Sequence, residues 1–74
     1  MTIGMTVKRA EEIKKHSVVK IVENVPAGDS VFDMLIGDIE KDPLNEFNLI
    51  WTSAANGLRV QVKKYQLIQV VSEP

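Results

Sequence analysis

The residues best suited to contacting a ligand lie in the second half of the chain, where basic, amide and aromatic side chains stand close together. Arg59, Gln61 and Lys63 alternate along one stretch, and Lys64 and Tyr65 follow at once. Alternate side chains share one face of a β-strand, so the first three are expected to project on one side. A basic strand face beside an aromatic ring is suited to binding phosphates and stacking bases. The same pattern is also typical of an ordinary solvated sheet face.

A second candidate set is acidic and consists of Asp38, Glu40 and Asp42. These residues are spaced by two, so they share a face if one strand continues through them. Carboxylates grouped in this way could meet a hard cation such as calcium, but the ligand spacing and the glycine of a calcium-binding loop are missing. We therefore interpret them as an acidic patch without a metal. Such a patch either guards a strand edge against pairing or docks on a basic partner.

No catalytic constellation is recognisable in the sequence. His16 is the only histidine and there is no cysteine, which excludes a structural zinc site built from such ligands. Ser17 adjoins His16, but neighbours on a strand point to opposite faces. The glycines are isolated, so the phosphate-binding loops that depend on clustered glycines are absent. We expect no catalytic residue, no cofactor and no enzymatic activity.

Composition narrows the class of protein further. A chain of 74 residues has room for one domain, residues 1–74, and an apolar fraction of 45% is that of a globular protein. The net charge of −1 gives no overall attraction to nucleic acid or to an acidic membrane surface. The absence of cysteine favours a cytoplasmic location. Met1 to Val7 does not resemble a signal peptide, and apolar runs such as Met34–Ile36 are far shorter than the ~20 residues that span a bilayer.

The clearest local signal is a hairpin around Asn56-Gly57, two residues that tolerate the positive φ of a type I′ turn. With these two residues as the whole turn, Trp51 lies opposite Val62. Alternation then predicts an inward face and a wet outward face. The inward face comprises Phe47, Leu49, Trp51, Leu58, Val60 and Val62. The outward face comprises Asn48, Ile50, Thr52, Arg59, Gln61 and Lys63. Trp51 is expected to be the core anchor of the hairpin.

Three more strands are predicted from β-branched and apolar runs: Ser17 to Val25, Val31 to Glu40, and Leu67 to Val71. Gly37 lies inside the second of these and predicts a bulge or sharp bend. Turn-forming residues at 26–29 separate the first two strands, Asp42-Pro43 ends the second, and residues 63–66 suit a short 3₁₀ turn.

The first third of the chain allows two interpretations. Apolar residues fall near helical spacing from Val7 to Val25, which is consistent with one helix. The valine-rich cluster after Ser17 fits a strand better, because β-branched side chains lose rotamer freedom in a helix. We therefore expect a short helix over residues 9–15, followed by a strand.

The order of the elements predicted from Val18 to Val71 resembles that of an SH3-like small barrel. The order is strand, long loop, bent strand, loop, tight hairpin, short turn and strand. The resemblance implies a mainly β fold, a five-stranded barrel over about residues 17–71 with a short N-terminal helix. Barrels of this kind include peptide-binding and nucleic-acid-binding modules, accessory subunits and plasmid toxins. Val60-Gln61-Val62-Lys63 is also similar to the Val-Gln-Ile-Tyr strand of plasmid-encoded type II dihydrofolate reductases, with Lys63 in place of the tyrosine.

Three functions follow as hypotheses. The first is a non-enzymatic protein-interaction module, or a small accessory subunit, that docks on a larger partner. The second is a nucleic-acid-binding barrel that uses Arg59, Gln61, Lys63, Lys64 and Tyr65. The third, an oligomeric reductase, requires a tetramer. We expect another protein as the partner, no membrane, and a monomer or small homo-oligomer whose contacts could involve Ile50, Met34 or Ile68.

Overall fold

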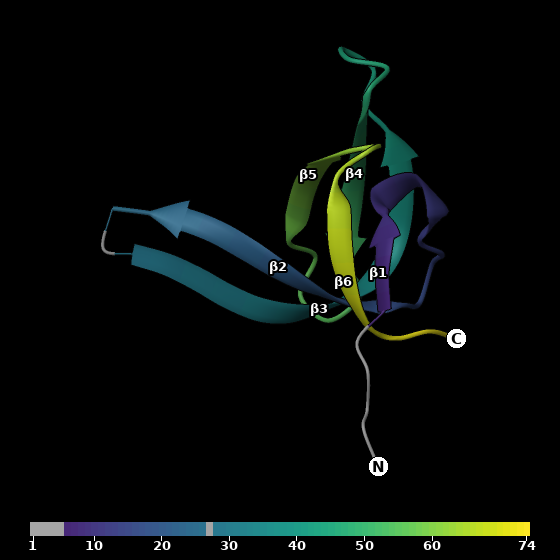
Figure 1. Cartoon of the computed structure of the whole chain (residues 1–74). Helices are drawn as coiled ribbons and strands as arrows, with labels where there is room; N and C mark the ends of the chain where they lie inside the picture. Colours follow the sequence, from purple (N-terminus) through teal and green to yellow (C-terminus); the bar gives the residue numbers. More distant parts are fainter. Residues whose placement is uncertain (1–5, 27) are drawn as a thin grey trace.

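The computed structural model describes residues 6–26 and 28–74, and these form a mainly β fold with antiparallel pairing (Figure 1). The elements are β1 (Thr6–Arg9), a 3₁₀ turn η1 (Ala10–Glu12), β2 (Val18–Val25), β3 (Gly28–Lys41), β4 (Asn48–Ser53), β5 (Arg59–Lys63) and β6 (Leu67–Ser72). The six strands form one sheet in the order β1-β6-β2-β3-β4-β5. Strands β1 and β5 are its edges, so backbone pairing does not close the sheet.

The long strand β3 links the two halves of the sheet through a bend at Gly37. Before the bend β3 pairs with β2, as far as Val18 opposite Leu35. After it β3 pairs with β4, and the register shifts between Ile36 and Asp38. A Cβ atom on Gly37 would lie 3.1 Å from both the Ala54 Cα and the Thr52 carbonyl oxygen. The predicted bulge is therefore confirmed, and the close approach of two backbones explains the glycine.

The predicted helix over residues 9–15 is wrong. Arg9 ends β1, which pairs with β6, and only Ala10–Glu12 turn as a 3₁₀ helix. The Ala10 N–H donates to the Gln66 carbonyl at 2.9 Å, and the Glu11 N–H donates to the Lys64 carbonyl at 3.0 Å. These bonds to the turn before β6 take the place of bonds within a helix. Because β1 adds a strand, the expected count of five is also wrong.

The predicted hairpin has the right faces but the wrong register. Trp51 lies opposite Val60, and Leu49 lies opposite Val62. The loop is wider than the expected two residues, because the Ser53 N–H donates to the Leu58 carbonyl at 2.7 Å across residues 54–57. Gly57 has a φ of +75°, whereas His16 is the one described non-glycine residue with positive φ, so a type I′ turn at Asn56-Gly57 is absent. The pairing differs from the expected one by two residues, which leaves the side chains of the paired residues 48–52 and 59–63 on their predicted faces.

The core lies between the two halves of the sheet, with Trp51 at its centre as predicted. Its buried apolar residues are Ala10, Ile13, Val19, Ile21, Met34, Ile36, Leu49, Trp51, Val62, Ile68 and Val70. Two residues assigned to the core face, Phe47 and Leu58, are instead 54% and 42% exposed, because they lie beyond the ends of the paired strands. Since Met34 and Ile68 are buried, they provide no surface for a dimer.

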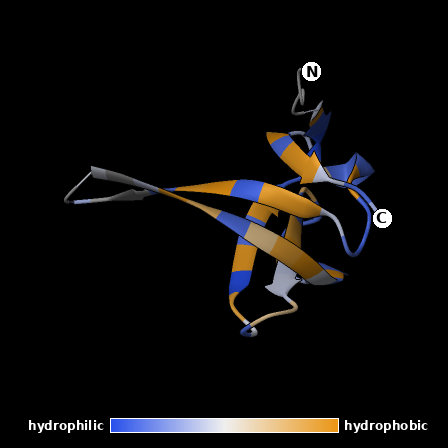
Figure 2. Cartoon of the chain, turned by 90° about the horizontal axis from the view of Figure 1, so that it is seen from below, coloured by the Kyte–Doolittle hydropathy of each residue, from blue (hydrophilic) through white to orange (hydrophobic). Residues whose placement is uncertain are grey.

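The outer half of the β2–β3 hairpin forms an arm that extends away from the other strands (Figures 1 and 2). We define the arm as residues 20–25 and 28–33, which pair with each other, whereas only Val18 and Val19 of β2 pair with β6. At its base Ile21 is buried and Phe32 packs against the core. Across the other face Lys20 binds Asp33 at 3.1 Å. The arm thus grows out of the core as a continuation of two central strands.

The bend at Gly37 yields a test of stability. We expect Gly37→Ala to lower the free energy of unfolding by about 1–3 kcal/mol, because the added methyl group meets backbone rather than a movable side chain. Urea denaturation measures the change. Ser30→Ala on the same strand, at an exposed position, is the control and should change stability by less than about 0.5 kcal/mol. Equal stability of the two variants would contradict the steric role of Gly37.

His16 adopts the left-handed backbone conformation, with a φ of +74°, in an exposed turn. Its N–H donates to the Ile36 carbonyl at 2.9 Å, and the Ile36 N–H donates to the Ser17 carbonyl at 2.9 Å, so the turn is held against β3. Left-handed φ costs an ordinary residue roughly 1–2 kcal/mol, and glycine avoids that cost.

We therefore expect His16→Gly to raise the free energy of unfolding by about 0.5 kcal/mol, the strain relieved minus the extra chain entropy of glycine. His16→Val should lower it, because a β-branched residue is least compatible with this backbone. Thermal and urea unfolding of the three proteins give the order. A glycine variant less stable than wild type would show that the imidazole contributes more to the turn than relief of the backbone strain.

Candidate functional site

The structure places the predicted basic residues on β5 and in the turn that follows it. Arg59, Gln61 and Lys63 are exposed on the outward face of β5, as predicted. Lys64 is half-buried and its backbone is engaged, because its N–H donates to the Phe47 carbonyl at 2.8 Å. Tyr65 is exposed. The five residues thus lie along one strand and its turn, but they do not form an uninterrupted basic surface.

The predicted acidic patch meets the basic set on the same face of the sheet. β4 separates β3 from β5, and Ile50 on β4 lies between Glu40 and Gln61 in the register. Glu40 reaches across to Arg59, with 3.6 Å between Oε2 and the guanidinium nitrogen. Asp38 pairs with Lys15 at 3.3 Å. The two candidate sets therefore neutralise one another in part, which the sequence did not reveal because it did not give the order of the strands.

Asp42 differs from the other two acids because it is largely buried and immobilised. It follows the end of β3, and its carboxylate accepts hydrogen bonds from the Leu44 N–H at 2.8 Å and from the Gln61 side-chain amide at 2.6 Å. The Leu44 N–H is the main reason that the pKa of Asp42 is lowered, burial acts in the opposite direction, and the Gln61 amide lowers the pKa further. Asp42 therefore anchors the loop to β5 and is not part of an exposed patch.

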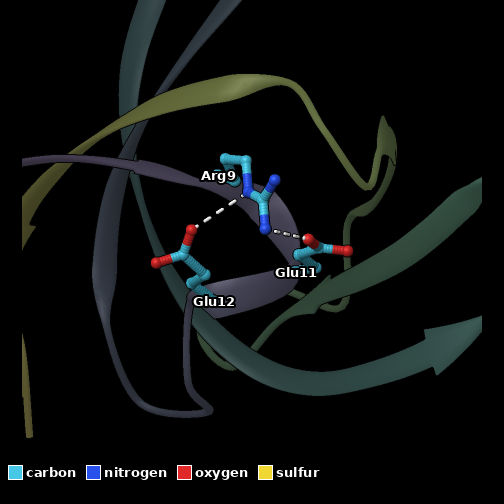
Figure 3. A network of polar contacts seen from close by, with 3 residues as sticks. All are labelled: Arg9, Glu11 and Glu12. Atoms are coloured by element: carbon cyan, nitrogen blue, oxygen red, sulfur yellow. Dashed lines mark hydrogen bonds and ion pairs between the residues drawn. The ribbon is translucent and has the colours of Figure 1, made fainter.

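A small aromatic cluster lies beside the end of β5. The Tyr65 and Phe47 rings have centroids 6.5 Å apart, and the Arg9 guanidinium lies 5.9 Å from the Tyr65 centroid. Figure 3 shows Arg9 between two carboxylates, with Glu11 at 2.6 Å and Glu12 at 3.1 Å. Because this cation already has two acidic partners, it contributes little positive potential for binding an anion.

A groove of about 670 Å³ lies between β2, β5 and β6. Buried side chains of Ile21, Val62 and Ile68 contribute to its apolar lining. Leu67 also lines it and is 68% exposed. The groove exists because β2 leaves β6 after Val19, where the arm begins, and because β5 is an edge strand. We call this feature the β5 groove.

The sequence did not predict the β5 groove, although it named one of its walls. Arg59 and Gln61 line it, so two residues of the predicted basic face also belong to the groove. The lining from β2 and β6 was assigned only to strands and core. The sequence of β5 did contain a weak indication of an edge strand, since a short strand with basic residues at both ends is typical of a sheet edge.

Within residues 6–26 and 28–74, no group of three His, Cys, Asp or Glu side chains is arranged to hold a metal ion. None of the helical turns in the same part of the chain is long and apolar enough to cross a membrane. Comparisons of the chain with protein-family models, with curated proteins and with solved structures find no match. The function of the β5 groove is therefore inferred from the side chains and backbone groups that line it.

The environment of Asp42 predicts a dependence of stability on pH. Because the folded pKa lies below the usual 3.8, the carboxylate stabilises the fold above about pH 4, and this contribution is lost as the pH falls through the folded pKa. We expect Asp42→Asn to be less stable than wild type at pH 7 and to lose less stability on acidification. Urea denaturation at a series of pH values measures both effects.

Gln61→Leu provides the matched comparison for Asp42, because it removes one donor and leaves the Leu44 N–H in place. Its loss of stability on acidification should lie between those of wild type and Asp42→Asn. An Asp42→Asn variant that retains the complete acid dependence of wild type would refute this assignment.

Proposed function

We propose that this chain is a non-enzymatic protein-interaction module, used alone or as a small accessory subunit, that docks on a larger partner through the β5 groove. The observation that carries the proposal is the groove itself, a concavity lined by both apolar and polar side chains, next to a strand edge that has no neighbour among the described strands. Concave surfaces of this size that combine apolar and polar side chains are typical binding sites. Exposed Leu67 at the groove adds apolar surface for a partner to cover.

Nucleic-acid binding by Arg59, Gln61, Lys63, Lys64 and Tyr65 is the second candidate. The ion pair between Arg59 and Glu40 and the two acids around Arg9 weigh against it. Binding to nucleic acid depends on Lys and Arg side chains that neutralise phosphates and so release the counterions condensed on the nucleic acid. In this protein several of the cations already face carboxylates. The net charge of −1 points the same way. We therefore rank protein binding first.

The fold proposed for this module is an SH3-like small barrel formed by β2 to β6. Its support is the bend in β3, which lets one strand serve both halves of the sheet, and the return of β6 to pair with β2. The proposal includes neither a catalytic residue nor a cofactor. A cytoplasmic location is proposed from the absence of cysteine alone.

Capture from a lysate of the source organism tests the proposed function with a matched pair of variants. Leu67→Glu places a carboxylate in the groove, and Leu44→Glu makes the same change at a residue that is 94% exposed and does not line it. We expect Leu67→Glu to reduce the recovered partner about tenfold or more, because docking would bury an unpaired charge. Leu44→Glu should recover as much partner as wild type. Mass spectrometry after nuclease treatment provides the measurement.

Two outcomes would contradict this proposal. Equal loss or equal recovery with the two variants would show that the groove is not the docking surface. Recovery of nucleic acid, with every captured protein released by nuclease, would favour the basic residues of β5 and its turn instead.

A further inference from the structure

Resting on the proposed function, we propose that the β5 groove takes an extended segment of the partner as an added β-strand, and that this segment is acidic on one face and apolar on the other. The added strand would lie along β5, with its acidic residues opposite Arg59 and Lys63. Its apolar residues would lie opposite Val60 and Val62, toward the groove. The inference rests on the direction of the backbone groups of β5, on its charges and on the lining of the groove.

The backbone of β5 presents free hydrogen-bonding groups at alternate residues. In an antiparallel pair, residues that exchange bonds alternate with residues whose N–H and C=O point away from the partner. Leu58 and Lys64 each bond to the preceding strand or its end, so the even-numbered residues between them face β4. The odd-numbered residues face the open edge. Consistent with this, the Lys63 N–H donates to the Gln66 side chain at 3.4 Å.

Arg59 and Gln61 therefore carry the backbone N–H and C=O groups that are directed at the groove. An extended chain laid beside β5 can bond to both residues, as in recognition by strand addition. The part of the edge available to it is short, because the Lys63 N–H has the Gln66 side chain as its acceptor. A segment of five to seven residues, at ~3.4 Å per residue, is long enough to cover β5 from Arg59 to Lys63.

A second copy of this chain is a poor occupant of the edge. If two β5 strands pair antiparallel, their outward residues Arg59, Gln61 and Lys63 face one another in every register that keeps the faces aligned. Each such pairing sets a cation against a cation or against an amide, and none sets it against an acid. Like charges directly opposite one another destabilise a strand pair. Pairing of two β5 strands is therefore disfavoured, whereas a partner strand with acids four residues apart is complementary to β5. The acid opposite Arg59 would compete with Glu40, which lies 3.6 Å from the guanidinium in an exposed ion pair, and the acid opposite Lys63 would not.

The inner face of the groove determines which residues of the partner segment are expected to be apolar. Val60 is half-buried and Val62 is buried, and both lie on the core side of β5. Residues opposite them on an added strand point to the same side, toward Ile21 and Ile68. The charged residues at the groove besides Arg59 are Lys20, which pairs with Asp33, and Glu23 on β2. Acidic side chains of the segment are therefore expected along β5 and not along β2.

The test uses a synthetic peptide, Thr-Glu-Val-Thr-Val-Glu-Thr, with blocked ends, and the full chain labelled with ¹⁵N. Its palindromic pattern presents the same faces in either strand direction. We expect saturable binding, with hydrogen exchange slowed at the Arg59 and Gln61 amides and little changed at Val60 and Val62, which already face β4. A control peptide with lysine in place of both glutamates should bind about tenfold more weakly. The double variant Arg59→Glu, Lys63→Glu should invert this preference.

Several results would overturn the inference: binding of both peptides with equal affinity, protection of Val60 and Val62 in place of Arg59 and Gln61, or no binding of the acidic peptide at millimolar concentration. These results leave the capture experiment with Leu67→Glu untouched. If Leu67→Glu still loses its partner, the groove docks a folded surface and not an added strand. If both experiments fail, the proposed function fails with the inference.

Discussion

The approach of two backbones at Gly37 is the contact on which the rest of the molecule depends. It allows β3 to turn sharply where it passes from β2 to β4, with the Thr52 carbonyl and the Ala54 Cα so close that a Cβ atom on Gly37 would force the backbone to shift. The bend faces the two halves of the sheet toward one another, which encloses Trp51. It also separates the end of the sheet formed by β5 from the end formed by β6 and β1, so that an edge strand and a groove remain.

The polar features of the surface are consequences of the same arrangement. Once β3, β4 and β5 lie side by side, acids on β3 and bases on β5 are two strands apart, within reach of long side chains such as those of Glu40 and Arg59. Asp42 comes directly after the strand, where Gln61 and the Leu44 N–H can meet its carboxylate. The order of the strands in the sheet decides which charged side chains pair with one another, and therefore which of them are available to a partner.

Much of the fold was predictable because it depends on local alternation. Side chains alternate with a period of two, so the inward placement of Leu49, Trp51 and Val62 survived a hairpin register that was wrong by two residues. The width of the loop was not predictable from Asn56-Gly57, because Ser53 and Asn56 bond to nearby backbone N–H groups and stabilise a wider turn. The path of residues 6–13 depends on β6 and on the turn before it. Residues so distant in the sequence leave no local pattern. For the candidate site, the outward face of β5 was predictable, and the groove beside it was not.

The position of β6 between β1 and β2 has a consequence for how the chain folds. The strand that comes last in the sequence pairs with the first two, and Thr6 faces Val70 across the ladder. During synthesis, β2, β3, β4 and β5 can form their local hairpins in order as they leave the ribosome. Neither β1 nor the outer side of β2 can complete its pairing until residues 67–72 emerge. A chain with so many pairings between distant residues is expected to fold slowly for its size. Before β6 has paired, the unpaired edges and the apolar face of the nascent sheet stay exposed. Chaperone binding or aggregation is therefore most favoured in the period before residues 67–72 emerge.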